Sequence, residues 1–432
     1  MDILKQLTTQ ADQVEVVEIQ REATSVSYES NRLKASQVEE TSGIAVRVVK
    51  DGQLGFAATS DTAATAKLVD NVLESAAYGD KIPLVFPSPQ PAPDVVTYDP
   101  KIVEVPIPRL VEIGQEIVDL FLEVESESQV FVDLKRGVQS AKVRNHAGTD
   151  IAFQRSPLSI DVRIDRVQED DVLMMFDTSG TTTWQENYMA SAQELAEKLH
   201  LAKRNATVKS GRMPVIFSPT GALVLALPVL PAINGKNVYK GISPMRDKLG
   251  EKIFDEKLTI IDDPTISGKF ASAAYDDEGV AHRRTTLIKN GVLNSFIYDL
   301  KTAAQAGAQS TGNGSRSLFN PPRPSTTNFC IQPGNISLKE MLAGMDEGLL
   351  VEYPLGLGQG NIISGAFSNT WSLAFKVEKG EIVGRVKDIS IAGNIYEMLQ
   401  NIAALSRETA WIYNNFNLPY ILLNTVNVVA KA

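Results

Sequence analysis

Alternating apolar and polar positions predict strands in the first part of the chain. The segment 14–30, VEVVEIQREATSVSYES, is rich in β-branched residues and predicts two strands. The segment 43–59 predicts a hairpin, because two apolar runs flank Lys50-Asp51-Gly52 and Asp-Gly tolerates the positive φ angles of a two-residue turn. Segment 128–177 predicts an antiparallel meander with turns at Arg136-Gly137 and at residues 145–148.

Helical spacing of apolar residues predicts helices between these strands. They are expected at residues 1–12, from Asp61 or Thr62 to Tyr78, at 109–124 and at 186–205.

The second half reads as short strands, turns and helices. Residues 213–219 predict a strand, 220–235 an apolar helix broken by prolines, and 285–297 a hairpin turned at Asn290-Gly291. Helices are expected at 337–345, where Ser337 and Glu340 form a capping-box pattern, and at 394–410. Strands and helices are segregated, so we predict an α+β fold of two domains with largely antiparallel sheets and flanking helices.

Domain boundaries follow from length and proline content. A chain of 432 residues suggests two or three domains at about 150 residues each. The proline-rich segment 82–108 predicts a stiff connector, and Lys209-Ser210-Gly211 a boundary. We therefore expect an N-terminal domain at 1–208 and a β-rich C-terminal domain at 209–432.

Charge and cysteine content restrict the function. With 52 Asp and Glu against 42 Lys and Arg, the net charge is −10, which disfavours binding to nucleic acids or anionic membranes. The single cysteine excludes an intramolecular disulfide and fits a reducing compartment. The first ten residues lack a signal-peptide pattern and no apolar run spans a membrane, so a cytoplasmic protein is expected.

Residues 262–334 hold the candidate chemistry. Six groups that could bind a metal or form turns lie within about twenty residues: Asp262, Asp263, Asp276, Asp277, Glu278 and His282. Their spacing does not match an EF-hand loop, so turn formation and ligand binding both remain open. The glycine-rich segments 310–316 and 356–361 are not nucleotide-binding loops, but glycines let a ligand approach the backbone closely. Cys330 is expected to be a small buried hydrophobe.

The motifs IDDP, DDEGVAHRRTTLIKNGVL, STGNG and TNFCIQPG resemble the TldD/PmbA family, also called modulators of DNA gyrase. The segments GIAVRVVKDGQLGFAATSD, FSPTGALV and KGISPMRDKLGE extend this resemblance over residues 14–428. In that family, TldD-like chains hold zinc through an HExxxH helix, with its Glu as general base, and a C-terminal Cys. The two His positions fall here on Ala226 and Pro231, the Glu position falls on Leu227, and no Cys follows Cys330. The chain therefore resembles the PmbA (TldE) branch, which lacks the zinc motif.

The resemblance implies a function shared with a partner. A TldD-like subunit would supply zinc, and this chain, with no catalytic or metal-binding residue and no cofactor of its own, would bind extended or unfolded peptides and stabilise a heterodimer. A homodimer in isolation is also open. The candidate substrate-binding residues are Asp277, Glu278, Asn313 and Asn361.

Two alternatives remain open from the sequence. One is an independently active hydrolase that uses the acidic stretch 262–282, with or without a different metal. The other is a regulatory protein that binds DNA gyrase or another partner, suggested by the family's older name.

Overall fold

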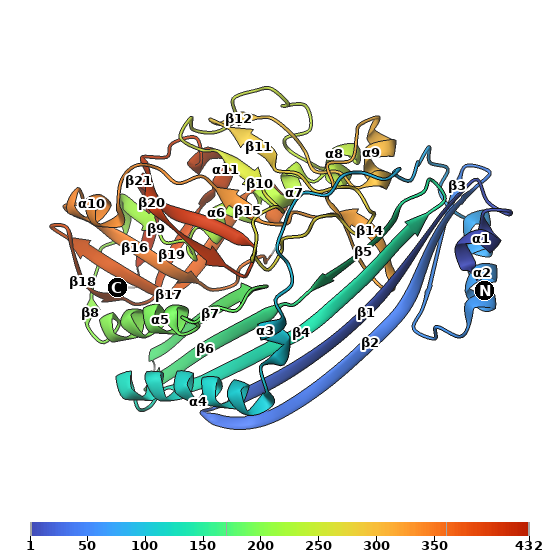
Figure 1. Ribbon diagram of the computed structural model, residues 1–432. Helices are drawn as coiled ribbons and strands as arrows, with labels where there is room; N and C mark the ends of the chain where they lie inside the picture. Colours follow the sequence, from blue (N-terminus) through green and yellow to red (C-terminus); the bar gives the residue numbers. More distant parts are fainter. Residues whose placement is uncertain (1, 170, 360, 431–432) are drawn as a thin grey trace.

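The computed structural model describes residues 2–169, 171–359 and 361–430, and each half of the chain builds one large β-sheet (Figure 1). Strands are mostly antiparallel and helices lie at the sides of the sheets, so the predicted α+β class is confirmed. None of the described helices is long and apolar enough to cross a membrane.

The first sheet is long and curved. Its antiparallel strands are arranged in the order β3-β2-β1-β4-β6-β7, with β5 beside β4 (Figure 1). Buried positions alternate along β6, whereas β1 and β2 each contain a continuous buried run, and the long strands curve beneath the second half of the chain (Figure 1). The strands are β1 (Gln13–Glu29), β2 (Arg32–Lys50), β3 (Gln53–Thr59), β4 (Gln129–Asn145), β5 (Asp150–Arg155), β6 (Leu158–Gln168) and β7 (Asp171–Thr181).

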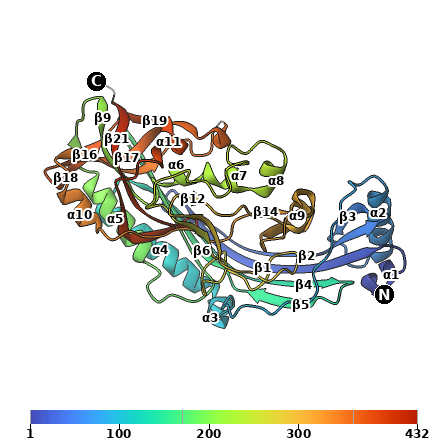
Figure 2. The same ribbon diagram turned by 90° about the horizontal axis from the view of Figure 1, so that it is seen from above.

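Helices cover the two ends of this sheet. At one end lie α1 (Ile3–Leu7) and α2 (Thr65–Ala77), beside β3. At the other end lie α4 (Ile107–Val124) and α5 (Ala190–Leu201), with the short α3 (Pro100–Glu104) nearby (Figure 2). The apolar face of α4 is buried against the sheet because its hydrophobic residues recur at helical spacing.

The second sheet partly closes on itself. Its pairings run β21-β9-β16-β17-β19 and return to β21, so five strands form a ring. The strands are β8 (Asn205–Ala206), β9 (Gly211–Phe217), β10 (Ile260–Asp262), β11 (Thr285–Lys289), β12 (Val292–Leu293), β15 (Phe329–Ile331), β16 (Glu347–Pro354), β17 (Ala366–Glu378), β18 (Glu381–Val386), β19 (Ile389–Asn394), β20 (Ala404–Ile412) and β21 (Phe416–Ala430).

Short helices and a separate ribbon complete this half. The ribbon consists of β13 (Gly314–Ser317) and β14 (Asn320–Pro324). The helices are α6 (Leu223–Ala226), α7 (Val229–Ile233), α8 (Gly235–Tyr239), α9 (Leu300–Ala306), α10 (Leu338–Ala343), α11 (Ile395–Met398) and the 3₁₀ helix η1 (Ile362–Ser364).

One hydrophobic cluster joins the two sheets. Val130 and Ile164 of the first sheet share it with Ile216, Leu373 and Phe375 of the second, and α4 and α5 contribute to it as well. The two halves therefore bury apolar surface against each other, although each also has a cluster of its own. The predicted division near residue 208 stays a prediction.

Several predicted turns and caps are present. Asp51 and Gly52 have φ angles of 52° and 75°, and Asn290 and Gly291 have 49° and 77°, as the hairpin signals require. Ser337 and Glu340 form the predicted capping box at α10.

Two strand predictions are wrong in the first sheet. Residues 14–30 form the single strand β1 rather than two, and the expected turn at Arg136-Gly137 lies inside β4. Gly137 is needed for close packing rather than for a turn. A Cβ atom added at this position would lie 2.2 Å from the Glu22 carbonyl oxygen on β1, so glycine permits the close contact between the two strands. Pairing with β1 and β6 keeps β4 continuous at that position.

The helix predicted at 394–410 is also wrong. Helix α11 ends at Met398, and residues 404–412 form β20, which pairs with β21. The Ala, Leu, Glu and Arg of this segment favour a helix locally, but hydrogen bonds to the long neighbouring strand outweigh that preference. The helix predicted at 186–205 is shorter, at 190–201, and α2 begins at Thr65 rather than at 61 or 62. The connector 82–108 is extended to residue 99 and then contains α3 and the start of α4.

We expect the protein to lose much of its stability when a side chain of the hydrophobic cluster between the two sheets is shortened. Leu373 is fully buried, so Leu373→Ala removes packing contacts and leaves a cavity, which costs about 2–5 kcal/mol. The matched control, Leu33→Ala on β2, alters a side chain that is 50% exposed and stays within about 0.5 kcal/mol. Urea unfolding followed by fluorescence measures both, and equal effects of the two variants would contradict the shared cluster.

Candidate functional site

A tight turn at residues 275–281 organises the acidic stretch. The Asp276 carboxylate accepts the backbone N–H groups of Glu278 and Val280, each at 2.9 Å, and its other oxygen accepts Gly314 N–H at 2.9 Å. Gly279 takes a φ of 79°, a conformation that glycine adopts without strain. Asp276 is therefore a turn former that also ties the turn to β13.

A buried ion pair lies across the first hairpin. Antiparallel register places Glu15 on β1 directly opposite Arg47 on β2. The guanidinium donates Nε–H to one carboxylate oxygen at 2.8 Å and Nη2–H to the other at 2.6 Å. Both side chains are almost completely excluded from solvent. This two-bond geometry is the strongest arrangement of an arginine with a carboxylate.

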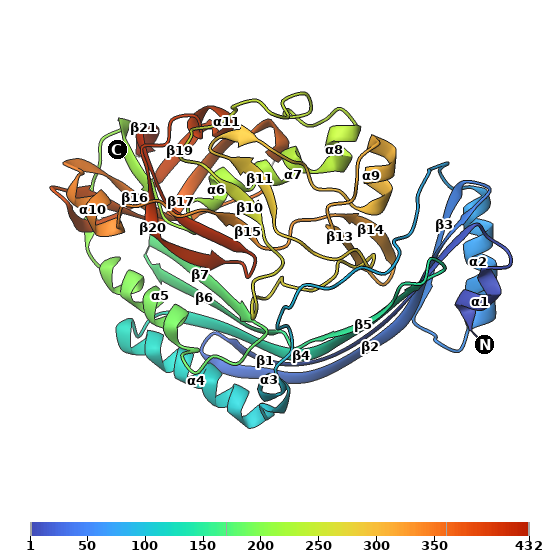
Figure 3. The same ribbon diagram turned by 45° about the horizontal axis from the view of Figure 1, so that its top comes forward.

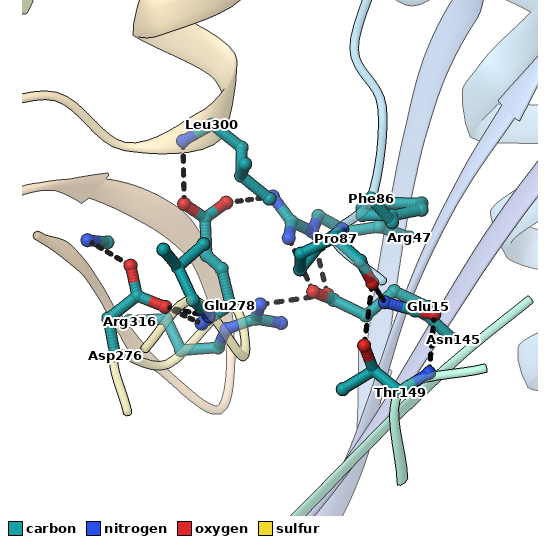
Figure 4. Close-up of polar contacts among 12 residues, drawn as sticks. Glu15, Arg47, Phe86, Pro87, Asn145, Thr149, Asp276, Glu278, Leu300 and Arg316 are labelled. Carbon is teal, nitrogen blue, oxygen red and sulfur yellow. Dashed lines mark hydrogen bonds and ion pairs between the residues drawn. The ribbon is translucent and has the colours of Figure 1, made fainter. Parts of the chain in front are cut away.

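Two residues from the second half of the chain join this pair. Arg47 Nη1 donates to Glu278 at 2.6 Å, and Arg316 Nη2 on β13 donates to Glu15 at 2.8 Å (Figure 4). We call these four residues, Glu15, Arg47, Glu278 and Arg316, the buried charge network. It connects segments about 230–300 positions apart in the sequence and links the first sheet to the second half of the chain.

Neighbouring groups fix the network in place. The free oxygen of Glu278 accepts the backbone N–H of Leu300, the first residue of α9, at 2.7 Å. The Arg47 guanidinium lies 5.0 Å from the centre of the Phe86 ring, within cation–π range. Asn145 and Thr149 both donate to the carbonyl of Pro87, which holds the connector beside the network (Figure 4).

Burial and neighbouring charges shift the carboxyl pKa values in opposite directions. Burial raises the pKa of Glu15, but the charges of Arg316 and Arg47 together outweigh it and lower that pKa. Burial raises the pKa of Asp276 well above its usual value, and the nearby Glu278 carboxylate adds to the rise. Burial likewise raises the pKa of Asp277, against the opposing effect of Arg316. Of these three carboxylates, Glu15 is the one whose pKa is lowered, so its charged form is favoured.

A cavity of about 350 Å³ lies beside the turn, between β5 and the second half of the chain. Arg155 of β5 lines it together with Asp277, His282 and Asn313. Burial lowers the pKa of His282 to about 4, so its imidazole is neutral at pH 7, and its buried Nδ1 has no hydrogen-bond partner among the described residues. The cavity is therefore lined by a cation, Arg155, and by a neutral imidazole, His282.

The predicted substrate-binding residues do not form one group. Asp277 and Asn313 line the cavity, whereas Glu278 is buried in the charge network and faces Arg47. Asn361 lies elsewhere, in an exposed loop before η1, which contacts α7. Its neighbour at position 360, part of the glycine-rich segment 356–361, lies outside the described residues. The role of Asp277, Glu278, Asn313 and Asn361 in substrate binding stays a prediction.

Asn313 has a structural partner in Asp262. Its amide nitrogen donates to Asp262 at 2.6 Å, and the other carboxylate oxygen accepts the Thr327 backbone N–H at 2.7 Å. Burial raises the pKa of Asp262 to about 6 despite these hydrogen bonds. Asp263 accepts the backbone N–H and the hydroxyl of Thr265, which is a turn arrangement. Several acidic residues of the stretch therefore organise backbone.

Sequence reasoning missed the arginines and Glu15. Each of Glu15 and Arg47 is a single charge within an apolar run of a predicted strand, VEVV and AVRVV. A charge surrounded by valines on a buried strand requires an opposite charge nearby, and that was the available signal. Cys330 lies half-buried on β15, and burial raises the pKa of its thiol to about 12, so it is not a nucleophile at neutral pH.

The positions that match the zinc motif of TldD-like chains are filled by hydrocarbon. Ala226 ends α6 inside the largest hydrophobic cluster, Leu227 packs against that cluster, and Pro231 lies within α7. None of these side chains can ligate a metal or accept a proton, so zinc does not fit there. Within residues 2–169, 171–359 and 361–430, no three His, Cys, Asp or Glu side chains are placed to hold a metal ion.

Comparisons with known proteins define the class first: the chain carries domains of a metallopeptidase family. The model described as PmbA/TldA metallopeptidase C-terminal domain matches residues 210–430, and the model of PmbA/TldA metallopeptidase domain 1 matches residues 14–76. Because the first match covers slightly more than half of the chain, the protein belongs to the PmbA/TldA metallopeptidase family.

Individual relatives agree with this assignment. The chain is 29% identical over 404 residues to an uncharacterized protein of Methanocaldococcus jannaschii, covering 91% of each. It is 34% identical to a metalloprotease of the same organism over 52% of this chain and 49% of the relative. The crystal structure of TldE from Thermococcus kodakarensis matches with a TM-score of 0.90 and 25% identity, covering 99% of each chain.

We expect substitution of a network arginine to lower the unfolding free energy far more than substitution of an exposed arginine. Arg47→Met leaves Glu278 buried with only the Leu300 N–H and Glu15 with only Arg316, and breaking a buried pair in this way costs about 3–5 kcal/mol. The same change at Arg109, whose ion pairs with Glu112 and Glu116 are solvent-exposed, costs less than about 1 kcal/mol. Urea titration measures the unfolding free energy of both variants. Similar losses would show that the buried charge network stabilises the fold no more than an exposed ion pair does.

We expect the unfolding free energy to depend on pH through the titration of Asp262. Its pKa is raised to about 6 in the folded state from an ordinary value of 3.8, so folded protein binds this proton more tightly. The stability that Asp262 contributes is therefore fully present below about pH 4 and is lost as the pH rises through about 6. At about 1.4 kcal/mol per pKa unit, the loss approaches about 3 kcal/mol.

The measurement is the difference in unfolding free energy between the unmodified protein and Asp262→Asn at several pH values. This difference is expected to fall between pH 4 and pH 6, because asparagine does not titrate. A difference that stays constant over this range would mean that Asp262 titrates normally.

Proposed function

We propose that this chain is the PmbA/TldE-like, non-catalytic subunit of a two-chain metalloprotease that acts on unfolded or extended peptides. The observation that carries the proposal is the apolar filling of the three zinc-motif positions, in a fold that matches TldE along its whole length. A TldD-like partner would supply the zinc and the general base. This chain would bind substrate and complete the assembly.

Two features support a role in holding peptides. The first sheet ends in the edge strands β3 and β7, and strand edges can pair with the backbone of an extended peptide. The cavity lined by Asp277 and Asn313 opens between the two halves of the chain, where polar groups could orient a peptide. Heterodimer formation with the partner, a homodimer in its absence and a cytoplasmic location are parts of the same proposal.

An independently active hydrolase is less well supported. Asp276 uses both of its oxygens to accept backbone N–H groups, and Glu278 uses both of its own for Arg47 and Leu300. These carboxylates are occupied in maintaining the turn, so they are poorly placed to bind water or a metal. A regulatory role toward DNA gyrase has no structural feature in its favour.

Reconstitution with a TldD-like chain tests the proposal. The chain alone is expected to contain no stoichiometric zinc and to leave an unfolded fluorogenic peptide intact, whereas the mixture cleaves it. Zinc is measured by elemental analysis, and cleavage by the increase in fluorescence. In the mixture, replacing the general-base Glu of the partner's HExxxH by Gln lowers the rate by about 10²–10⁴-fold.

The matched control for contamination is this chain purified without the partner and with added zinc. Cleavage by that sample, or zinc bound at one ion per chain, would reject the non-catalytic role. Failure of the two chains to co-elute on size exclusion would reject the two-chain assembly.

A further inference from the structure

A second, larger hollow lies beside the buried charge network, and Arg47 and Arg316 form part of its wall. It has a volume of about 950 Å³ and lies between the β2–β3–α2 end of the first sheet and the segments α8, α9 and β13–β14. Figure 3 shows this end of the sheet rising opposite α9 and β14. We call this hollow the interdomain cleft. Its size is at the upper end of the range of ligand-binding clefts.

Cationic side chains outnumber acidic ones along the cleft, although two of them, Arg47 and Arg316, are paired with the buried Glu15 and Glu278. Six cationic side chains line it against two acidic ones. The cations are Arg47, Lys236, Lys240, Lys301, Arg316 and Arg323. Since the chain carries a net charge of −10, this local excess of cations runs against the overall composition.

Both acidic side chains in the cleft already have partners. Asp80 forms an ion pair with Lys301 at 2.9 Å, and Asp299 caps α9 by accepting the Thr302 N–H at 2.8 Å. The exposed Lys236, Lys240 and Arg323 have no ion-pair partner within the part of the chain that the structure describes. Three exposed cations are therefore available to a ligand.

Arg316 adds a buried cation to the cleft wall. Its side chain is 1% exposed and pairs with Glu15 through Nη2 alone. Its Nε and Nη1 are buried and have no hydrogen-bond partner among the described residues. Buried donors without partners are costly, and an anionic group in the cleft would relieve that cost.

The shape of the cleft favours a peptide over a nucleic acid. The exposed rings of Tyr78 and Tyr239 lie on facing walls, where they can contact an extended chain from both sides. A nucleic acid carries its charge well beyond one cleft, so the rest of this acidic surface would repel it. A short acidic peptide segment places its charge only where the cations are.

We propose that the interdomain cleft binds an acidic segment of an extended polypeptide through Lys236, Lys240 and Arg323. The inference rests on the proposed function, because it names the class of peptide that the subunit would hold. Glutamate or aspartate side chains of the segment face the three exposed cations, and one carboxylate reaches toward Arg316.

Fluorescence anisotropy with this chain alone tests the inference. The probes are fluorescein-labelled glutamate-rich, serine-rich and lysine-rich peptides of equal length. The glutamate-rich peptide is expected to bind most tightly, with an affinity that falls as salt increases, because the interaction is between exposed charges. The triple variant Lys236→Glu, Lys240→Glu, Arg323→Glu is expected to lose at least about tenfold in affinity.

A control triple variant separates local from overall charge. Lys209→Glu, Lys289→Glu and Lys339→Glu change the net charge by the same amount at exposed positions that do not line the cleft. This variant is expected to retain most of the affinity. Equal losses in both triple variants would show that only net charge matters and would overturn the proposal.

Two further results would overturn the inference. One is equal binding of the three peptides, and the other is tighter binding of a single-stranded oligonucleotide than of the glutamate-rich peptide. The assay needs neither zinc nor the partner chain, so its failure would leave reconstituted proteolysis unaffected. Conversely, if the glutamate-rich peptide binds but the two chains together do not cleave peptides, the two-chain protease is rejected and the proposed peptide binding in the interdomain cleft stands.

Discussion

The buried charge network places a strict demand on the rest of this structure. Four charged side chains from both halves of the chain are removed from water, and each must keep its partners because an unpaired buried charge is strongly unfavourable. Meeting that demand fixes the register of β1 against β2, the turn that presents Glu278 and the position of β13. The first sheet and the second half of the chain are therefore held in one relative arrangement, which the shared hydrophobic cluster reinforces.

That arrangement creates two hollows beside the network. Arg155, Asp277 and Asn313 line the smaller cavity, and the exposed lysines line the larger interdomain cleft. Ser315, next to Arg316 on β13, borders both. The carboxylates of the acidic stretch hold the turn and the network, and in this way they position the walls of both hollows.

Much of the fold could be predicted because it depends on local signals. The Asp-Gly and Asn-Gly turns, the α10 capping box and the amphipathic α4 are all decided by neighbouring residues. Predictions failed where pairing with another strand decided the outcome. β20 became a strand because β21 lies beside it, and Gly137 remained within β4 because β1 passes within contact distance. The same limit applied to the site, since Asp277 and Asn313 meet at the cavity while Asn361 lies apart.

The sequence by itself determined the family resemblance and the α+β class, and it has Ala226, Leu227 and Pro231, which cannot ligate a metal, at the positions that the resemblance assigns to the zinc motif. It also contained the charges of the network, but as isolated residues within apolar strands. Only the tertiary structure decided that Glu15 and Arg47 face each other and meet Glu278 and Arg316. Such pairing depends on contacts between segments hundreds of positions apart, and no local spacing records those contacts.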